Sequence, residues 1–159
     1  MSVEPLLPPR ALPALLTEVK QAILRRFFVA LADQGFDDIR EGHGCVFGFI
    51  DVEHGSRLTD LAERSGLTKQ AVGEAATELE RRGYLERVPD PRDRRAKIIK
   101  LTPRGLEAAI TGRRLFAKIE REWAEQLGED LLAGLREAAE RIAAAEREDS
   151  VQTGTALRM

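Results

Sequence analysis

Residues 58–79 read LTDLAERSGLTKQAVGEAATEL, a pattern of two short helices joined by a tight turn. Where two such helices cross, a small residue must let their backbones approach, and Ala62 supplies it. Four residues later, Gly66 can adopt the left-handed backbone of the turn without a Cβ penalty. The second helix is anchored by apolar residues at helical spacing, namely Val72, Ala75, Ala76 and Leu79. The segment therefore predicts a helix-turn-helix, with an ordinary helical hairpin as the alternative.

The outward face of the second helix is polar, and its side chains suit contact with bases. The candidate recognition residues are Thr68, which should cap the helix, Lys69, Gln70, Gly73, Glu74 and Thr77. Glutamine can pair bidentately with adenine, glutamate can accept from cytosine N4, and lysine can reach guanine or phosphate. Glycine inside a helix costs about 1 kcal/mol relative to alanine, and close approach to a duplex would be a functional reason for Gly73. A face that is merely solvated is the alternative.

A hairpin is expected directly after this helix. Residues 84–88 and 98–101 are typical of two strands, and residues 89–97 between them are predicted to be irregular. The candidate contact residues of this wing are Arg92, Asp93, Arg94, Arg95 and Lys97. Exposed arginines beside a recognition helix suit a narrow minor groove, and we expect Asp93 to pair with a neighbouring arginine. Without the helix-turn-helix, a solvated loop would be the preferred interpretation.

Helices are predicted on both sides of this module. Apolar residues recur at helical spacing from Leu12 to Leu31, and a short helix is expected at about residues 43–52. Thr102 and Pro103 suit the N-cap and first position of a long helix that ends at Gly128. Its expected inward residues are Leu106, Ala109, Ile110, Phe116, Ile119, Trp123 and Leu127. A last helix should bury Leu131, Leu135, Ala138, Ala139 and Ile142.

These terminal helices are more apolar than a small winged domain needs in order to be covered. We therefore expect them to pack against a second copy of the chain, with a monomer completed by the same helices as the alternative. The expected organisation is an N-terminal arm (residues 1–13) and helices within residues 1–54, a winged helix-turn-helix module at 55–102, dimerisation helices at 103–148 and a flexible tail at 149–159.

Composition narrows the classes of protein and site. Residues 55–105 hold twelve Lys or Arg against eight Asp or Glu, whereas the rest of the chain holds thirteen against nineteen. A basic middle between acidic ends is typical of a DNA-reading module inside a dimer scaffold. The single cysteine, Cys45, excludes an internal disulfide and a cysteine-based zinc cluster; it is expected to be a small core residue, with a redox switch as the alternative. No signal peptide, membrane span, metal site or cofactor motif is recognised, so a cytoplasmic protein is expected.

At these motifs the sequence resembles the MarR family of bacterial regulators. The segments that carry the resemblance are residues 58–62 (LTDLA), 66–72 (GLTKQAV), 79–87 (LERRGYLER) and 90–96 (DPRDRRA), followed by Leu101-Thr102. The aspartate-arginine-arginine wing followed by Leu-Thr is the most specific piece. Gly73-Glu74 departs from the pattern, because many members carry a hydroxyl residue followed by a basic one.

The resemblance implies a triangular homodimer with interlocked terminal helices and two winged domains that bind a pseudo-palindromic operator. It also implies repression that is relieved by a small anionic or phenolic ligand or by cysteine oxidation. By residue, it places Thr68, Lys69, Gln70, Gly73 and Glu74 on the recognition helix, and Arg94 and Arg95 on the wing.

The sequence therefore predicts a mainly α fold with a small β-hairpin wing, a winged helix-turn-helix flanked by dimerisation helices. The predicted function is that of a non-enzymatic transcriptional regulator, a repressor that binds double-stranded DNA as a homodimer. One alternative is a winged-helix module that binds another protein and no DNA. A second is a small enzyme with a winged accessory region, for which no catalytic constellation is recognised.

Overall fold

The computed structural model describes the backbone of residues 10–156, and the side chains of these residues except Arg94 and residues 147–156. The chain divides into two compact units, Met1–Phe116 and Ala117–Met159. The predicted arm therefore lies largely outside the described residues, and Pro13 already stands in the first turn of a helix. In chain order the elements are α1 (Leu12–Asp33), the 3₁₀ turn η1 (Glu41–His43), α2 (Gly44–Phe47), α3 (Leu58–Ser65), α4 (Lys69–Arg81), β1 (Leu85–Asp90), β2 (Asp93–Leu101), α5 (Pro103–Leu127) and α6 (Glu129–Ala156).

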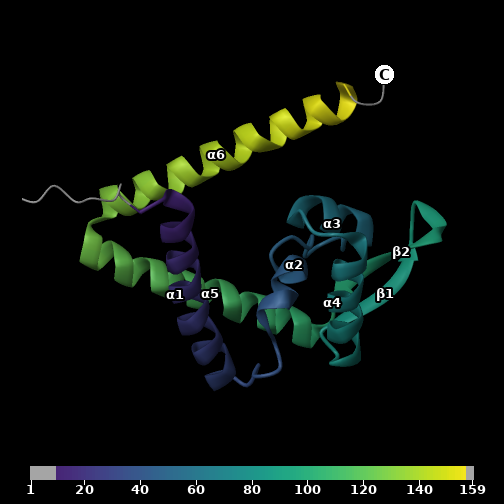
Figure 1. Cartoon of the computed structure of the whole chain (residues 1–159). Helices are drawn as coiled ribbons and strands as arrows, with labels where there is room; N and C mark the ends of the chain where they lie inside the picture. Colours follow the sequence, from purple (N-terminus) through teal and green to yellow (C-terminus); the bar gives the residue numbers. More distant parts are fainter. Residues whose placement is uncertain (1–9, 157–159) are drawn as a thin grey trace, which may run out of the picture. The chain divides into compact units, whose positions relative to one another are not determined.

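The fold is mainly helical with one hairpin, as the sequence predicts. Helices α2, α3 and α4 pack against one another, and α4 also contacts β1 (Figure 1). Within the described part of the chain, no helix combines the length and the apolar character needed to cross a membrane.

Helix α1 buries only its C-terminal part. Phe27 and Leu31 are buried, and the Phe27 ring stacks on Phe116 of α5 with 4.0 Å between ring centroids. The helix ends where Gly35 takes a φ of 89° and donates its N–H to Ala32 O at 2.9 Å. The apolar residues of its first two turns are exposed, namely Leu12, Leu15, Leu16 and Val19.

The prediction of a short helix at residues 43–52 is wrong in its extent. The structure has the turn η1 and a single helical turn, α2, which ends before Gly48. The Asp51 carboxylate accepts from the backbone N–H groups of Glu53 (2.9 Å) and His54 (2.8 Å). This side chain closes a turn and so competes with continuation of the helix.

The strands of the hairpin are longer than the sequence indicates. They pair in antiparallel register from Leu85↔Leu101 to Pro89↔Lys97 and meet again at Asp90↔Asp93, so only Pro91 and Arg92 form the turn. The prediction of an irregular segment at 89–97 is therefore wrong. Proline is tolerated at an edge strand or a bulge, and β1 is an edge with a register shift directly after Pro89. On the other side of β2, Ser56 and Ile99 exchange two backbone hydrogen bonds of 2.8 and 2.9 Å.

Helix α5 starts as the sequence predicts. The Thr102 hydroxyl accepts from the Gly105 N–H at 3.0 Å and donates to Gly83 O at 2.6 Å, so it caps the helix and ties it to the turn before β1. A Cβ at position 105 would lie 2.0 Å from the Tyr84 carbonyl oxygen, so only glycine fits this approach.

Several expected inward residues of the terminal helices are exposed in the single chain. They are Leu106, Ile110 and Leu127 of α5, and Leu131, Leu135 and Ile142 of α6. Among the inward residues expected in α5 only Ile119 is buried, and the first turns bury Gly105, Ala108 and Gly112 instead, so the face predicted there is wrong. All the residues that α6 was expected to bury are exposed in the single chain, Ala138 and Ala139 included. Helix α6 extends to Ala156, into the segment expected to be a flexible tail.

Candidate nucleic-acid interface

Helix α4 is held firmly on one side and presents its polar side to solvent. Thr68 caps it, with the hydroxyl oxygen 3.2 Å from the Ala71 N–H, and Gly66 makes the preceding turn with a φ of 70°. Leu61 of α3 and Val72 and Leu79 of α4 are fully buried. On the opposite side, five of the six predicted recognition residues are exposed, namely Thr68, Lys69, Gln70, Glu74 and Thr77.

Gly73, the sixth, is half-buried and lies on the part of this face that is next to α3. A Cβ built at this position would lie 3.6 Å from Leu58 of α3, an ordinary contact distance. Packing inside the chain therefore does not require glycine here. Its helix cost of about 1 kcal/mol is not explained by the fold.

The exposed face of α4 carries a connected set of hydrogen bonds. The Gln70 amide donates to the Glu74 carboxylate at 3.1 Å, and the Thr77 hydroxyl donates to Gly73 O at 2.8 Å. Arg87 of β1 donates to the Thr77 oxygen at 2.9 Å and pairs with Glu80 at 3.1 Å. Sequence reasoning missed Arg87, because only the pairing of β1 beside α4 brings it to this face.

The wing is positioned by Asp90. Its buried carboxylate accepts from Arg57 Nε at 2.7 Å and from the Arg92 N–H at 2.8 Å, which links the start of α3 to the turn of the hairpin. The Arg92 N–H and the Arg57 guanidinium hold the pKa of Asp90 below its usual value.

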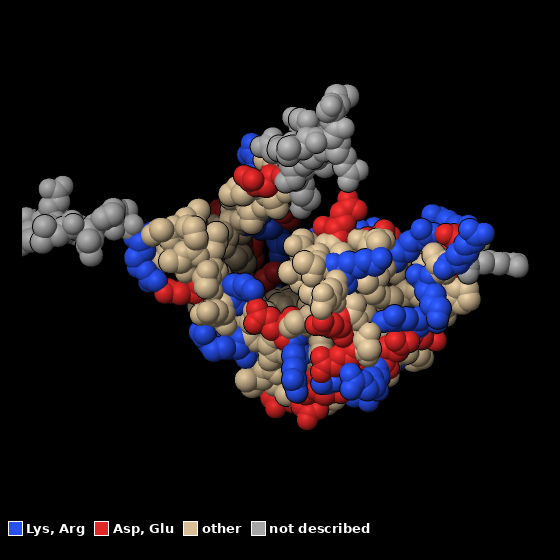
Figure 2. Space-filling view, turned by 45° about the vertical axis from the view of Figure 1, so that its right-hand side comes forward, with Lys and Arg blue, Asp and Glu red and all other residues tan. Residues whose placement is uncertain are grey.

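Asp93 has a smaller role than the sequence indicated. Its carboxylate accepts from the Arg95 N–H at 3.1 Å, and among the described side chains it forms no ion pair. The expected pairing with a neighbouring arginine is not seen for Arg92 or Arg95, and for Arg94 it stays a prediction. Arg92, Arg95 and Lys97 are exposed, and the side chain of Arg94 lies outside the description. Basic side chains gather around this wing, with acidic ones between them and below (Figure 2).

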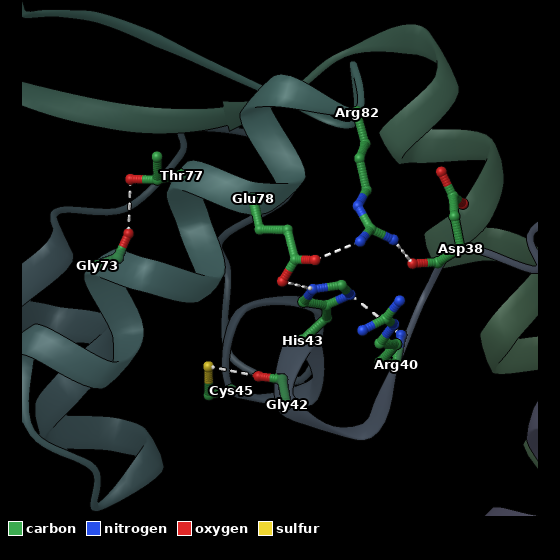
Figure 3. A network of polar contacts seen from close by, with 9 residues as sticks. All are labelled: Asp38, Arg40, Gly42, His43, Cys45, Gly73, Thr77, Glu78 and Arg82. Carbon is green, nitrogen blue, oxygen red and sulfur yellow. Dashed lines mark hydrogen bonds and ion pairs between the residues drawn. The ribbon is translucent and has the colours of Figure 1, made fainter.

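Behind α4, a polar cluster fixes its C-terminal half (Figure 3). His43 is buried, and its Nδ1 accepts from the Arg40 N–H at 3.1 Å, so the ring proton is on Nε2 and is donated to Glu78 at 3.0 Å. The hydrogen bond from His43 and the nearby Arg82 charge lower the pKa of Glu78. Arg82 bonds to both Glu78 and the Asp38 carbonyl, which joins α4 to the segment after α1.

Cys45 lies beside this cluster and is buried, as expected for a small core residue. Its thiol donates to Gly42 O at 3.1 Å, and burial raises its pKa. The thiolate is the reactive form of cysteine, so this environment disfavours the alternative of a redox switch.

An apolar cavity of about 320 Å³ lies between α1, the segment after it and the first turns of α5. Phe27, Phe28, Phe47 and Phe116 supply aromatic walls, and Arg40, Glu41 and Arg113 are its charged residues. Arg113 forms no ion pair with any described side chain. A partly open pocket with aromatic walls and a few charged groups is typical of a small-molecule site.

Comparison with known proteins shows which proteins this winged helix-turn-helix resembles. A family model described as MarR family matches residues 37–96, which include the helix-turn-helix and the wing. Over these residues the chain is similar to the MarR family. No curated protein matches it. Solved structures of MarR-family regulators superpose on most of the chain, which confirms the winged-helix fold.

Three of these structures are informative. The transcriptional repressor CouR, bound to a 23-mer DNA duplex, is 25% identical over 84% of this chain and 92% of its own, with a TM-score of 0.70. CouR from Rhodococcus jostii RHA1 bound to p-coumaroyl-CoA is 25% identical over 81% of this chain and 89% of its own, with a TM-score of 0.67. Wild-type MarR from E. coli, at 22% identity over 85% of this chain and 98% of its own, supports the fold alone, with a TM-score of 0.66.

The anchoring role of Asp90 leads to a prediction for D90N. Asparagine can still accept from the Arg92 N–H but cannot form the ion pair with Arg57, so the melting temperature at neutral pH should fall by a few degrees. The folded-state pKa of Asp90 is lowered, so its contribution is present above the unfolded pKa of about 3.9 and is lost as the pH falls through the folded value. The difference between wild type and D90N should therefore narrow as the pH falls from 6 to below 4.

D93N is the matched control, because it removes the same charge from the same hairpin and keeps the acceptor for the Arg95 N–H. Thermal unfolding across the pH series should show little change in this variant. The anchoring role would be contradicted if the melting temperatures of D90N and D93N fell equally. It would also be contradicted if the decrease in D90N did not depend on pH.

Proposed function

We propose that this protein is a DNA-binding transcriptional regulator, a repressor that binds a pseudo-palindromic operator as a homodimer. The observation that carries the proposal is a capped recognition helix with an exposed polar face, beside a basic wing that Asp90 holds in place. The structural likeness to CouR, which has been solved on a DNA duplex, supports it. We propose no enzymatic activity, in keeping with a family of regulators, and a cytoplasmic location, where bacterial DNA lies.

The proposed DNA contacts form two groups. Thr68, Lys69, Gln70, Gly73, Glu74 and Thr77 would face the major groove, because a recognition helix enters it with its N-terminal residues against the base edges. Arg92, Asp93, Arg94, Arg95 and Lys97 would lie over the adjacent minor groove or its phosphates. Within the second group, Asp93 would orient the backbone of β2 and the cations would contact DNA.

The proposed dimer rests on exposed apolar faces. The first turns of α1 and the apolar stripe of α6 leave Leu12, Leu16, Leu131 and Ile142 between half and two-thirds exposed in the single chain. Such surfaces mark protein interaction sites. In this organisation the winged module of residues 55–102 binds DNA, and the flanking segments 1–54 and 103–148 join the two copies.

The function is tested by selecting fragments of genomic DNA with the purified protein. Two recognition helices of a symmetric dimer should select an inverted repeat whose half-sites lie on the order of 34 Å apart, one helical turn of DNA. Sedimentation should show a dimer at micromolar concentration. A stable monomer that binds specific DNA tightly would contradict the dimer, and failure to select any sequence would contradict the function.

A second prediction concerns the wing. Replacing Arg94 and Arg95 with alanine should weaken binding to many sequences and make it less dependent on salt, by about one counterion per lost phosphate contact. Preference for A·T-rich flanks should also decrease, because narrow grooves attract arginine most strongly. Operator affinity is measured across a salt series, with the fold checked by circular dichroism. An unchanged salt dependence would show that the wing is a solvated hairpin.

We also propose that the apolar cavity binds the effector that releases DNA. Its aromatic walls and Arg113 suit a small aromatic carboxylate, and its lining residues come from α1, the segment before α2, α2 itself, Gly48 and α5. Glu41 and Gly44 of this lining flank His43, which is bonded to Glu78 of α4. An occupant of the cavity therefore contacts a segment that holds the recognition helix.

R113Q tests this site against R114Q, which removes the same charge from the next residue, outside the lining. With a panel of aromatic carboxylates that includes 4-hydroxybenzoate, the concentration needed to release wild type from its operator should rise at least tenfold in R113Q and stay unchanged in R114Q. Equal responses of the two variants would show that Arg113 is not the carboxylate partner. Absence of release by every member of the panel would contradict the proposed effector class.

A further inference from the structure

The orientation of the Gln70 amide is fixed by its partner. A glutamine amide can be placed with its oxygen and nitrogen exchanged, but an ionised carboxylate can only accept hydrogen bonds. The contact of 3.1 Å to Glu74 therefore requires the Gln70 nitrogen on that side. One amide hydrogen is used in this contact, and the Gln70 oxygen is left as an acceptor.

The hydroxyl of Thr77, on the same face, also uses its hydrogen in a bond within the chain. Thr77 is one turn beyond Glu74, and its hydroxyl hydrogen is donated to the Gly73 carbonyl. Its oxygen in turn accepts from Arg87. The Thr77 hydrogen and one of the two Gln70 amide hydrogens are thus used within the chain. The centre of the α4 face presents the carboxylate of Glu74, which is exposed and pairs with no cation among the described residues.

We infer that the Glu74 carboxylate, held by Gln70, is the acceptor that reads a cytosine in each half-site of the operator. This inference rests on the proposed function and adds the base that the helix prefers. In the major groove, guanine presents N7 and O6 as acceptors, thymine presents O4, and adenine presents an acceptor beside its amino group. Cytosine alone offers an amino donor with no adjacent acceptor, so it is the base that a carboxylate accommodates without repulsion.

The charge of Glu74 makes this contact selective as well as attractive. A carboxylate brought near DNA phosphates is repelled at any sequence, and a charge-assisted hydrogen bond from cytosine N4 offsets that repulsion only where the base is correct. A well-placed contact to a base discriminates by roughly 1–3 kcal/mol, which corresponds to roughly 5–150-fold in affinity. The geometry thus assigns Glu74 the role of a specificity residue on α4.

The test uses the operator selected by the wild-type protein and three proteins: wild type, E74Q and E63Q. Glutamine at position 74 can still accept from Gln70 but has no charge and adds a donor. E63Q is the control for the loss of one negative charge from an exposed position of the same module. Each protein is titrated with the operator and with a duplex in which the candidate cytosine is replaced by 2-pyrimidinone, which lacks the N4 amino group.

Wild type and E63Q should lose roughly 5–150-fold in affinity when the amino group is removed, and E74Q should lose much less. E74Q should also accept guanine or thymine at this position in a repeated selection. If E74Q changes the affinity for all sequences equally, or if no selected position depends on residue 74, the inference is wrong. If the wild-type protein selects no DNA, the proposed function fails instead, so the two failures are distinguishable.

Discussion

The position of Tyr84 constrains the whole winged module. It is the largest fully buried side chain, and its backbone and side chain are both engaged. Its N–H donates to Leu79 O at 2.9 Å and its carbonyl accepts from the Thr102 N–H at 3.0 Å. Its hydroxyl bonds to Asp38 and accepts from Arg104, whose guanidinium lies 4.6 Å from the ring centre. One residue therefore joins the end of α4, the start of β1, the start of α5 and the segment after α1.

This arrangement explains which parts of the fold could be predicted from sequence. The helix-turn-helix depends on local signals, and the sequence shows all of them. They are a cap at Thr68, a left-handed glycine at Gly66 and an apolar face with Val72 and Leu79. The bridge from Ser56 to Ile99 and the ends of the hairpin strands depend on pairing between distant residues. Periodicity carries no information about such pairing when a proline and a run of charges interrupt it.

The candidate site also has one part that the sequence predicts and another that it does not. Residues on the exposed face of α4 follow from helical spacing, because position on a helix fixes the side. The sequence favours the wrong carboxylate as the anchor of the wing, because Asp93 stands between two arginines whereas Asp90 stands between two prolines. Only the closure of the hairpin turn buries Asp90 against Arg57, 33 residues earlier, and leaves Asp93 on the strand. Arg87 was missed for a related reason, because its neighbour Thr77 is on another element.

The burial of Cys45 gives the protein a built-in probe of its own dynamics. A thiol that is covered by the core, with its pKa raised, reacts with an alkylating reagent only after the surrounding structure opens. Because the chain has a single cysteine, each labelling event reports the opening of the same place, next to the His43–Glu78 contact behind the recognition helix. The labelling rate of the natural protein therefore measures how often this part of the winged module opens, without any engineered label.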